Sequence, residues 1–197
     1  MRALFIVIIS SIMLLSCTSE SERSAPPDST EKSLFEKVKE QTVKNPDDVD
    51  AWYHLADLYD RSELYAEEIA ALKKVVALDP GKGYAYIKLG TAYNRSGQYE
   101  DAIVNFEKAK QYFPKNPVLY NNLAVSYGKI GKLDQEIATL EKAIALRPRY
   151  ATARHNLGVA LLKKGKREEA LKQYAELRKF DEGTAISLKK EIDRKSK

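Results

Sequence analysis

Apolar and small residues recur along this chain with the spacing of helices that bury one face. In residues 83–116 a first set is spaced i, i+3, i+4, i+7, and it comprises Tyr86, Leu89, Gly90 and Tyr93. A second set lies after Gly97 with the same helical periodicity, and it comprises Ala102, Phe106 and Ala109. The pattern predicts one helix over 83–95 and another over 99–112.

Two residues mark the ends of these helices. Gly97 favours a turn between them, because glycine adopts positive φ without steric cost. Pro114 stops the second helix, because proline lacks an N–H and clashes with the preceding turn. The small residues Gly90 and Ala102 let the two helices approach closely. A pair of this kind cannot bury its apolar face alone, so we expect several pairs to stack.

The same pattern returns every 34 residues without a gap. Four units follow one another over 49–184, and their ranges are 49–82, 83–116, 117–150 and 151–184. Self-similarity at a period of this size is typical of solenoid proteins. The sequence therefore predicts an all-α solenoid of four stacked helix pairs.

These residues resemble the tetratricopeptide-repeat pattern. At the position of Tyr86 the family most often has Trp, and the first unit has that residue, Trp52. The resemblance implies a right-handed α-solenoid of helix pairs. The first unit departs from the family at Glu63, where the turn glycine belongs, and at Glu68, where a small residue belongs. We therefore expect an irregular turn in the first unit. In the fourth unit Glu182 replaces the terminal proline.

Short helices are predicted to cap both ends of the solenoid. Residues 31–48 resemble the second helix of a decayed repeat, with Leu34, Val38 and Gln41 directed inward. Residues 185–197 form the other cap. The apolar face of that cap comprises Ala185, Leu188 and Ile192.

The N-terminal residues predict a lipoprotein signal peptide that is not part of the fold. Arg2 precedes an uncharged apolar run over 3–15, which is too short to span a membrane and suits a signal-peptide core. The run ends at Ser16-Cys17 and resembles the bacterial lipobox. This implies removal of 1–16, diacylglycerol on the Cys17 thiol and an acyl chain such as palmitate on the new N-terminus. The alternative is an ordinary secretory signal that leaves Cys17 a free thiol.

Residues 17–30 are polar and contain two prolines, so we expect a disordered tether between the lipid and the solenoid. Thr18 follows the cysteine, in place of the Asp that marks inner-membrane retention in enteric bacteria. The expected location is therefore the bacterial cell envelope, with the chain anchored in the outer membrane and facing the periplasm.

Composition and charge narrow the function classes. The chain has 197 residues, of which 44% are hydrophobic and 31% charged, and its net charge of +5 is interspersed with acidic residues. A nucleic-acid binder would gather its basic residues on one face, so we expect no nucleic-acid partner. The sequence has no phosphate-binding loop, nucleophile motif or zinc spacing, and His54 and His155 lie three units apart. We therefore expect a non-enzymatic protein without a metal or another cofactor.

The family resemblance also implies a concave groove lined by the first helices of the units. Carried onto this chain, the groove comprises Tyr53, His54, Asp57, Tyr84, Ile87, Lys88, Thr91, Asn121, Asn122, Val125, His155, Asn156 and Val159. Asn122 and Asn156 occupy equivalent positions, where an amide can pair with the backbone of an extended peptide. The alternative is that both are simply tolerated polar surface residues. Tyr53 and Tyr84 lie outside the repeated core positions and are the candidate aromatic anchors.

Together these observations predict a lipid-anchored scaffold that binds a segment of another envelope protein in its groove. By family resemblance the partner belongs to pilus or secretion assembly, to outer-membrane assembly, or to the cell-wall enzymes. The alternative is a structural lipoprotein that associates with itself, for example as a homodimer, and has no peptide ligand.

Overall fold

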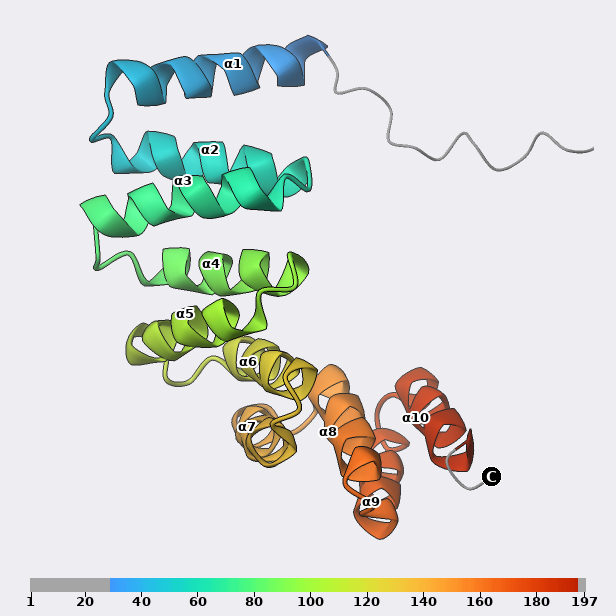
Figure 1. Cartoon of the computed structure of the whole chain (residues 1–197). Helices are drawn as coiled ribbons and strands as arrows, with labels where there is room; N and C mark the ends of the chain where they lie inside the picture. The colour runs from blue at the N-terminus through green and yellow to red at the C-terminus, as the bar shows by residue number, and fades with distance from the viewer. Residues whose placement is uncertain (1–28, 195–197) are drawn as a thin grey trace, which may run out of the picture.

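The computed structural model describes residues 29–194, which form ten α-helices without a β-strand (Figure 1). In chain order these are α1 (Ser29–Lys44), α2 (Val49–Arg61), α3 (Tyr65–Leu78), α4 (Gly83–Arg95), α5 (Tyr99–Tyr112), α6 (Pro117–Lys129), α7 (Leu133–Leu146), α8 (Ala151–Lys163), α9 (Arg167–Leu177) and α10 (Glu182–Arg194). None of these ten helices is long and apolar enough to cross a membrane. The predicted signal peptide, Cys17 and most of the tether lie outside the described residues, as do residues 195–197.

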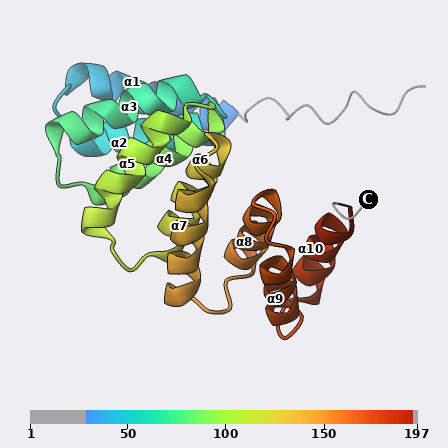
Figure 2. The same ribbon diagram turned by 60° about the horizontal axis from the view of Figure 1, so that its bottom comes forward.

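Eight of these helices form four pairs, α2–α3, α4–α5, α6–α7 and α8–α9, which stack in chain order. Each second helix packs against its own partner. In addition, α3, α5 and α7 pack against the first helix of the next pair, and α9 packs against α10. The stack twists along its length, so that α6 and α7 run in a clearly different direction from α2 and α3 (Figure 2). The helices predicted over 83–95 and 99–112 are α4 and α5. The prediction of an all-α solenoid of stacked helix pairs is confirmed.

Glycines at the helix contacts make room for large side chains of the neighbouring helix. A Cβ atom at Gly90 of α4 would lie 2.6 Å from the ring of Phe106 in α5, and that ring is fully buried. A Cβ atom at Gly158 of α8 would lie 2.6 Å from the side chain of Leu188 in α10. Each large side chain thus fills the volume that the glycine leaves, and the core reaches close packing.

The turn after α2 has the same shape as the later turns, although Glu63 stands where they have glycine. The φ angle is 57° at Glu63, and it is 78°, 77° and 79° at Gly97, Gly131 and Gly165. The backbone N–H of Leu64 donates to the carbonyl oxygen of Tyr59 at 2.9 Å, as Gln98 does to Tyr93. The expectation of an irregular turn is therefore wrong. The packing of α2 on α3 requires the common turn, and Glu63 adopts the left-handed conformation.

The N-terminal cap α1 begins at Ser29 and buries a different face from the predicted one. Leu34 is 47% exposed, and Gln41 is exposed as well. The inward residues are Phe35, Val38 and Thr42. Phe35 packs edge-on against Tyr59, with ring centroids 5.2 Å apart. This aromatic contact sets the rotation of α1, and the predicted inward positions Leu34 and Gln41 are each wrong by one residue.

The C-terminal cap α10 begins at Glu182, three residues before the predicted start. The preceding helix α9 has 11 residues, whereas α3, α5 and α7 have 14. The carboxylate of Asp181 accepts a hydrogen bond from the backbone N–H of Thr184 at 2.9 Å and so caps the new helix. Its predicted apolar face is confirmed, because three residues are fully buried: Ala185, Leu188 and Ile192.

Glu63→Gly is expected to raise the free energy of unfolding by about 0.5–1 kcal/mol, because glycine adopts positive φ without the steric cost that Glu63 bears. Urea denaturation followed by circular dichroism measures the change. The matched control is Lys74→Gly, at an exposed position inside α3, which should lower the free energy of unfolding by about 1 kcal/mol. A less stable Glu63→Gly variant would contradict the strained turn.

Candidate functional site

The first helices of the four pairs, α2, α4, α6 and α8, form one side of the stack, which we call the inner face. Helix α4 contacts α6, and α6 contacts α8. Within the described chain no comparable contact joins one second helix to another. Helices lie closer together on the inside of a curved stack. The inner face is therefore the concave side that solenoids use for binding.

The predicted groove residues all lie on these first helices, but their accessibility differs. Tyr84 is 61% exposed and His54 is exposed, whereas Asn121 is only 5% exposed. The other ten are partly exposed, and they are Tyr53, Asp57, Ile87, Lys88, Thr91, Asn122, Val125, His155, Asn156 and Val159. Asn121 is thus better described as part of the interior than as a groove residue.

Ion pairs link α2 to α4 at the N-terminal end of the inner face. The Lys88 ammonium lies 2.7 Å from Oδ1 of Asp57 and 3.6 Å from Oδ2 of Asp60. Arg95 also pairs with Asp60, and Lys82 pairs with Asp50. Burial alone would lower the pKa of Lys88, but the hydrogen bond and charge of Asp57 outweigh it and raise that pKa. The positive charges of α4 are therefore matched by the carboxylates of α2.

Behind these ion pairs lies a buried carboxyl group, that of Glu68 in α3. Its side chain is 2% exposed, and its Oε2 atom has no hydrogen-bond partner. Burial raises the pKa of Glu68 to about 7, and the nearby Asp60 carboxylate adds to this, against the lowering effect of Lys88 and Arg95. A buried carboxyl group without a partner favours its neutral form.

Amide side chains replace charges further along the inner face. The Asn94 amide donates to the backbone oxygen of Asn122 at 3.3 Å and accepts from the Ser126 hydroxyl at 2.8 Å. The Asn156 amide donates to Oδ1 of Asn121 at 3.0 Å. The two predicted ladder positions, Asn122 and Asn156, are therefore not bonded to each other. The Asn156 side chain bonds to Asn121 of the neighbouring repeat, whereas Asn122 contacts Asn94 of the preceding repeat only through its backbone oxygen. Their role in binding a peptide stays a prediction.

Sequence reasoning missed a second buried carboxyl group, that of Glu136 in α7. Its side chain is 6% exposed, its Oε2 atom has no hydrogen-bond partner, and burial raises its pKa. A Cβ atom at Gly128 of α6 would lie 2.5 Å from this carboxyl group, so the glycine makes space for it. The signal was available, because Glu136 lies two 34-residue periods after Glu68.

The two candidate aromatic anchors have different surroundings. Tyr53 is partly buried, and the ammonium groups of Lys82 and Lys88 lie 5.5 Å and 5.9 Å from its ring centroid. Tyr84 lies against Phe113, which follows α5, with ring centroids 4.3 Å apart. Phe113 was not among the predicted site residues, because it lies in the loop between units and not on a first helix.

The two histidines have separate environments. Nε2 of His155 lies 3.4 Å from the hydroxyl of Ser187 in α10, and His54 is exposed on α2. Between residues 29 and 194 no three side chains of His, Cys, Asp or Glu gather in a way that could hold a metal ion.

Comparisons with known proteins agree with this architecture. A family model described as "TPR repeat" matches residues 90–131 and 127–165, and one described as "Tetratricopeptide repeat" matches residues 38–83. No curated protein matches the chain.

Several solved structures are similar to this chain. A crystal structure of MamA is 25% identical with a TM-score of 0.72, and the match covers 83% of this chain and 91% of that one. MamA from Desulfovibrio magneticus RS-1 is 18% identical with a TM-score of 0.72, over 83% and 88% of the two chains. YrrB, described as a TPR protein with an unusual peptide-binding site, is 21% identical with a TM-score of 0.65, over 82% and 93%. At 18% and 21% identity, the similarity to MamA from Desulfovibrio magneticus RS-1 and to YrrB shows the fold alone.

The free energy of unfolding is expected to fall as the pH rises from 4.5 to about 8. Glu68 has a pKa of about 7 in the folded chain against an ordinary 4.5, so the folded state holds its proton more tightly than the unfolded state. Its stabilising contribution is complete below pH 4.5 and is lost as the pH rises through 7. The loss is of the order of 3 kcal/mol.

Urea denaturation at a series of pH values measures this dependence. Glu68→Gln should weaken the dependence of the free energy of unfolding on pH. The remaining dependence is the contribution of Glu136, which has the same direction. The control is Glu100→Gln, at an exposed position of α5, which should leave the curve unchanged. The same pH dependence in Glu68→Gln as in the wild type would refute the assignment.

Proposed function

We propose that this chain, which is built of tetratricopeptide repeats, is a scaffold that holds a segment of a partner protein against its inner face. The observation that supports this most directly is the exposure of Tyr84, at 61%. Four tyrosines at the repeated core positions are only between 5% and 9% exposed, and they are Tyr86, Tyr93, Tyr120 and Tyr127, whereas Tyr59 of the first unit is partly exposed. A large exposed aromatic ring on a concave face is typical of a binding anchor.

The inner face offers a bound segment two kinds of surface. Partly exposed apolar side chains extend from α4 to α8, and they are Ile87, Val125 and Val159. The Asn156 amide nitrogen donates to Asn121, and the Asn122 amide oxygen accepts from Asn121. A peptide backbone would therefore pair with the amide nitrogen of Asn122 and the amide oxygen of Asn156. YrrB, whose fold is similar, is described as having a peptide-binding site. A peptide in an extended or helical form is therefore the ligand class that we propose.

The proposal includes a lipid anchor at Cys17 and a place in the bacterial cell envelope. Its support is the N-terminal sequence, in which Arg2, the apolar run over 3–15 and Ser16-Cys17 have the order of a lipoprotein signal. Two or more acyl chains on one cysteine give a stable anchor. Thr18 after the cysteine favours the outer membrane, with the solenoid in the periplasm and an envelope protein as the partner.

A photo-reactive residue placed at Tyr84 or at Asn122 is expected to form one dominant adduct with another envelope protein in cells. The matched control is Val104, a 53% exposed position on the second helix α5, which should not form that adduct. Mass spectrometry identifies the products. Adducts only with a second copy of the chain would favour the self-associating alternative, and sedimentation of residues 29–197 would then show a dimer.

Cys17→Ser is expected to abolish incorporation of an alkyne-tagged fatty acid, because the thiol that carries the lipid is lost. Metabolic labelling followed by gel fluorescence measures this effect. Ser19→Ala, two residues further on, is the control and should behave as the wild type. Labelling that persists in Cys17→Ser would count against the lipoprotein signal.

A further inference from the structure

An exposed group of apolar side chains lies at the edge of the inner face, where the loop between α5 and α6 meets the start of α4. We call it the aromatic shelf, and it comprises Tyr84 and Phe113. The rings of Tyr84 and Phe113 lie at 44° to each other with centroids 4.3 Å apart. Tyr84 is 61% exposed, and Phe113 is partly buried against the core. One edge of the two-ring surface therefore faces solvent.

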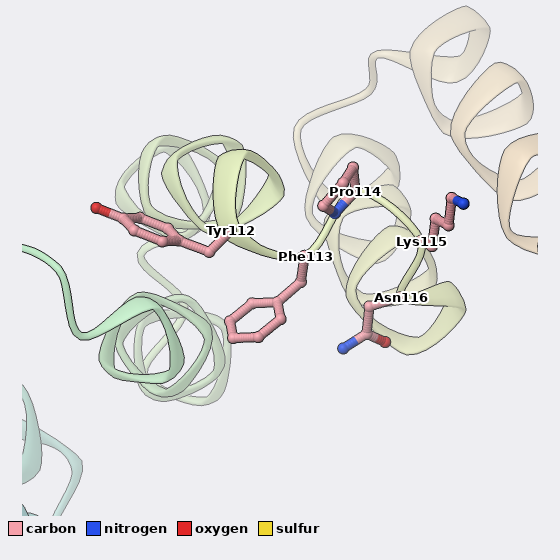
Figure 3. A pocket seen from close by; sticks show the side chains of 5 residues that line it. All are labelled: Tyr112, Phe113, Pro114, Lys115 and Asn116. Carbon is pink, nitrogen blue, oxygen red and sulfur yellow. The ribbon is translucent and has the colours of Figure 1, made fainter.

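A cavity of about 340 Å³ adjoins the shelf, and it is lined by Tyr112, Phe113, Pro114, Lys115 and Asn116 (Figure 3). Figure 3 shows the side chains of Phe113 and Asn116 pointing to the same side of the loop, with Tyr112 directed away from them. Phe113 belongs to both the shelf and the cavity. The two features form one continuous surface.

The loop that forms the cavity is held in place by its own contacts. The Tyr112 hydroxyl donates to the backbone oxygen of Pro80 at 2.8 Å. Oδ1 of Asn116 accepts from the backbone N–H groups of Val118 and Leu119 at 3.0 Å and 3.2 Å, which caps α6. Pro117 occupies the first turn of α6 and restricts φ there. A surface that is already ordered loses little entropy when a ligand binds.

The cavity that adjoins the shelf carries one unpaired positive charge, that of Lys115. This lysine lines the cavity, is exposed and makes no ion pair within the described chain. At the α2–α4 end of the inner face, by contrast, Lys88 and Arg95 are paired with carboxylates. An acidic partner would supply the negative charge that Lys115 lacks.

We propose that the aromatic shelf and its cavity bind an acidic segment of the partner that carries an aromatic or proline ring. The ring packs on Tyr84 and Phe113, and a flanking carboxylate lies near Lys115. Ring-on-ring contact provides the anchor, and Lys115 selects against basic segments. This inference rests on the proposed function, because it specifies the chemistry of the segment that the inner face holds.

The test is selection of peptides from a phage-displayed library of random dodecapeptides on the purified full-length chain in detergent. The selected sequences are expected to be enriched in Asp or Glu next to Phe, Tyr, Trp or Pro. Fluorescence polarisation with the most enriched peptide then measures affinity. Tyr84→Ala should weaken binding at least about tenfold, because the anchor is lost. Lys115→Gln should weaken it by about threefold at low salt and have little effect at high salt.

Val104→Ala, at the exposed position on α5, is the matched control and should bind as the wild type does. Circular dichroism melts show whether each variant is folded. The inference is overturned if no peptide is enriched, if the enriched peptides are neutral or basic, or if Tyr84→Ala binds them unchanged. An envelope partner that cross-links at Asn122 while the selection fails would leave the proposed function standing and remove only the inference. Selection of the expected acidic peptides without a cross-linked envelope partner would support the inferred binding chemistry and count against the envelope partner of the proposed function.

Discussion

The structure depends on one constraint, which is that no helix pair of this chain can bury its apolar face by itself. Each pair therefore needs the next one, and the contact between them must be close. Gly90 leaves space for the buried ring of Phe106, and Gly158 leaves space for Leu188 of the terminal helix. The apolar face of α10 closes the C-terminal end, because Leu188 and Ile192 are fully buried there.

The same constraint decides what the inner face looks like. Close packing brings the first helices together, so their polar side chains meet across the repeat boundaries and must pair. Charges pair between α2 and α4, as at Lys88 and Asp57, and amides pair further along, as at Asn156 and Asn121. The polar groups that connect repeats are thus largely occupied with each other. The ring of Tyr84 remains accessible, and the exposed Lys115 lies in the loop beside it.

Helix positions and the general fold could be predicted from the sequence, because a strict 34-residue period repeats the same local signals four times. Details that depend on a single contact could not. The rotation of α1 follows from the meeting of Phe35 with Tyr59, which no periodicity encodes. The burial of Asn121 follows from the approach of Asn156 on the next unit. The part of the candidate site formed by Phe113 was missed because family positions describe helices and not the loops between them.

The first unit combines two departures from the repeat pattern with the charged part of the inner face. The first unit contains both the left-handed Glu63 and the buried Glu68, and its α2 supplies the carboxylates that pair with α4. In a solenoid each unit contacts only its neighbours, so a local energetic cost in one unit need not weaken the distant ones. A sequence that retains a strained turn and an unpaired buried carboxyl group in one unit departs from local consistency there, and such departures are expected at functional sites. Because Glu136 occupies the equivalent buried position in the third unit, the left-handed turn at Glu63 and the ion pairs with α4 are what distinguish the first unit.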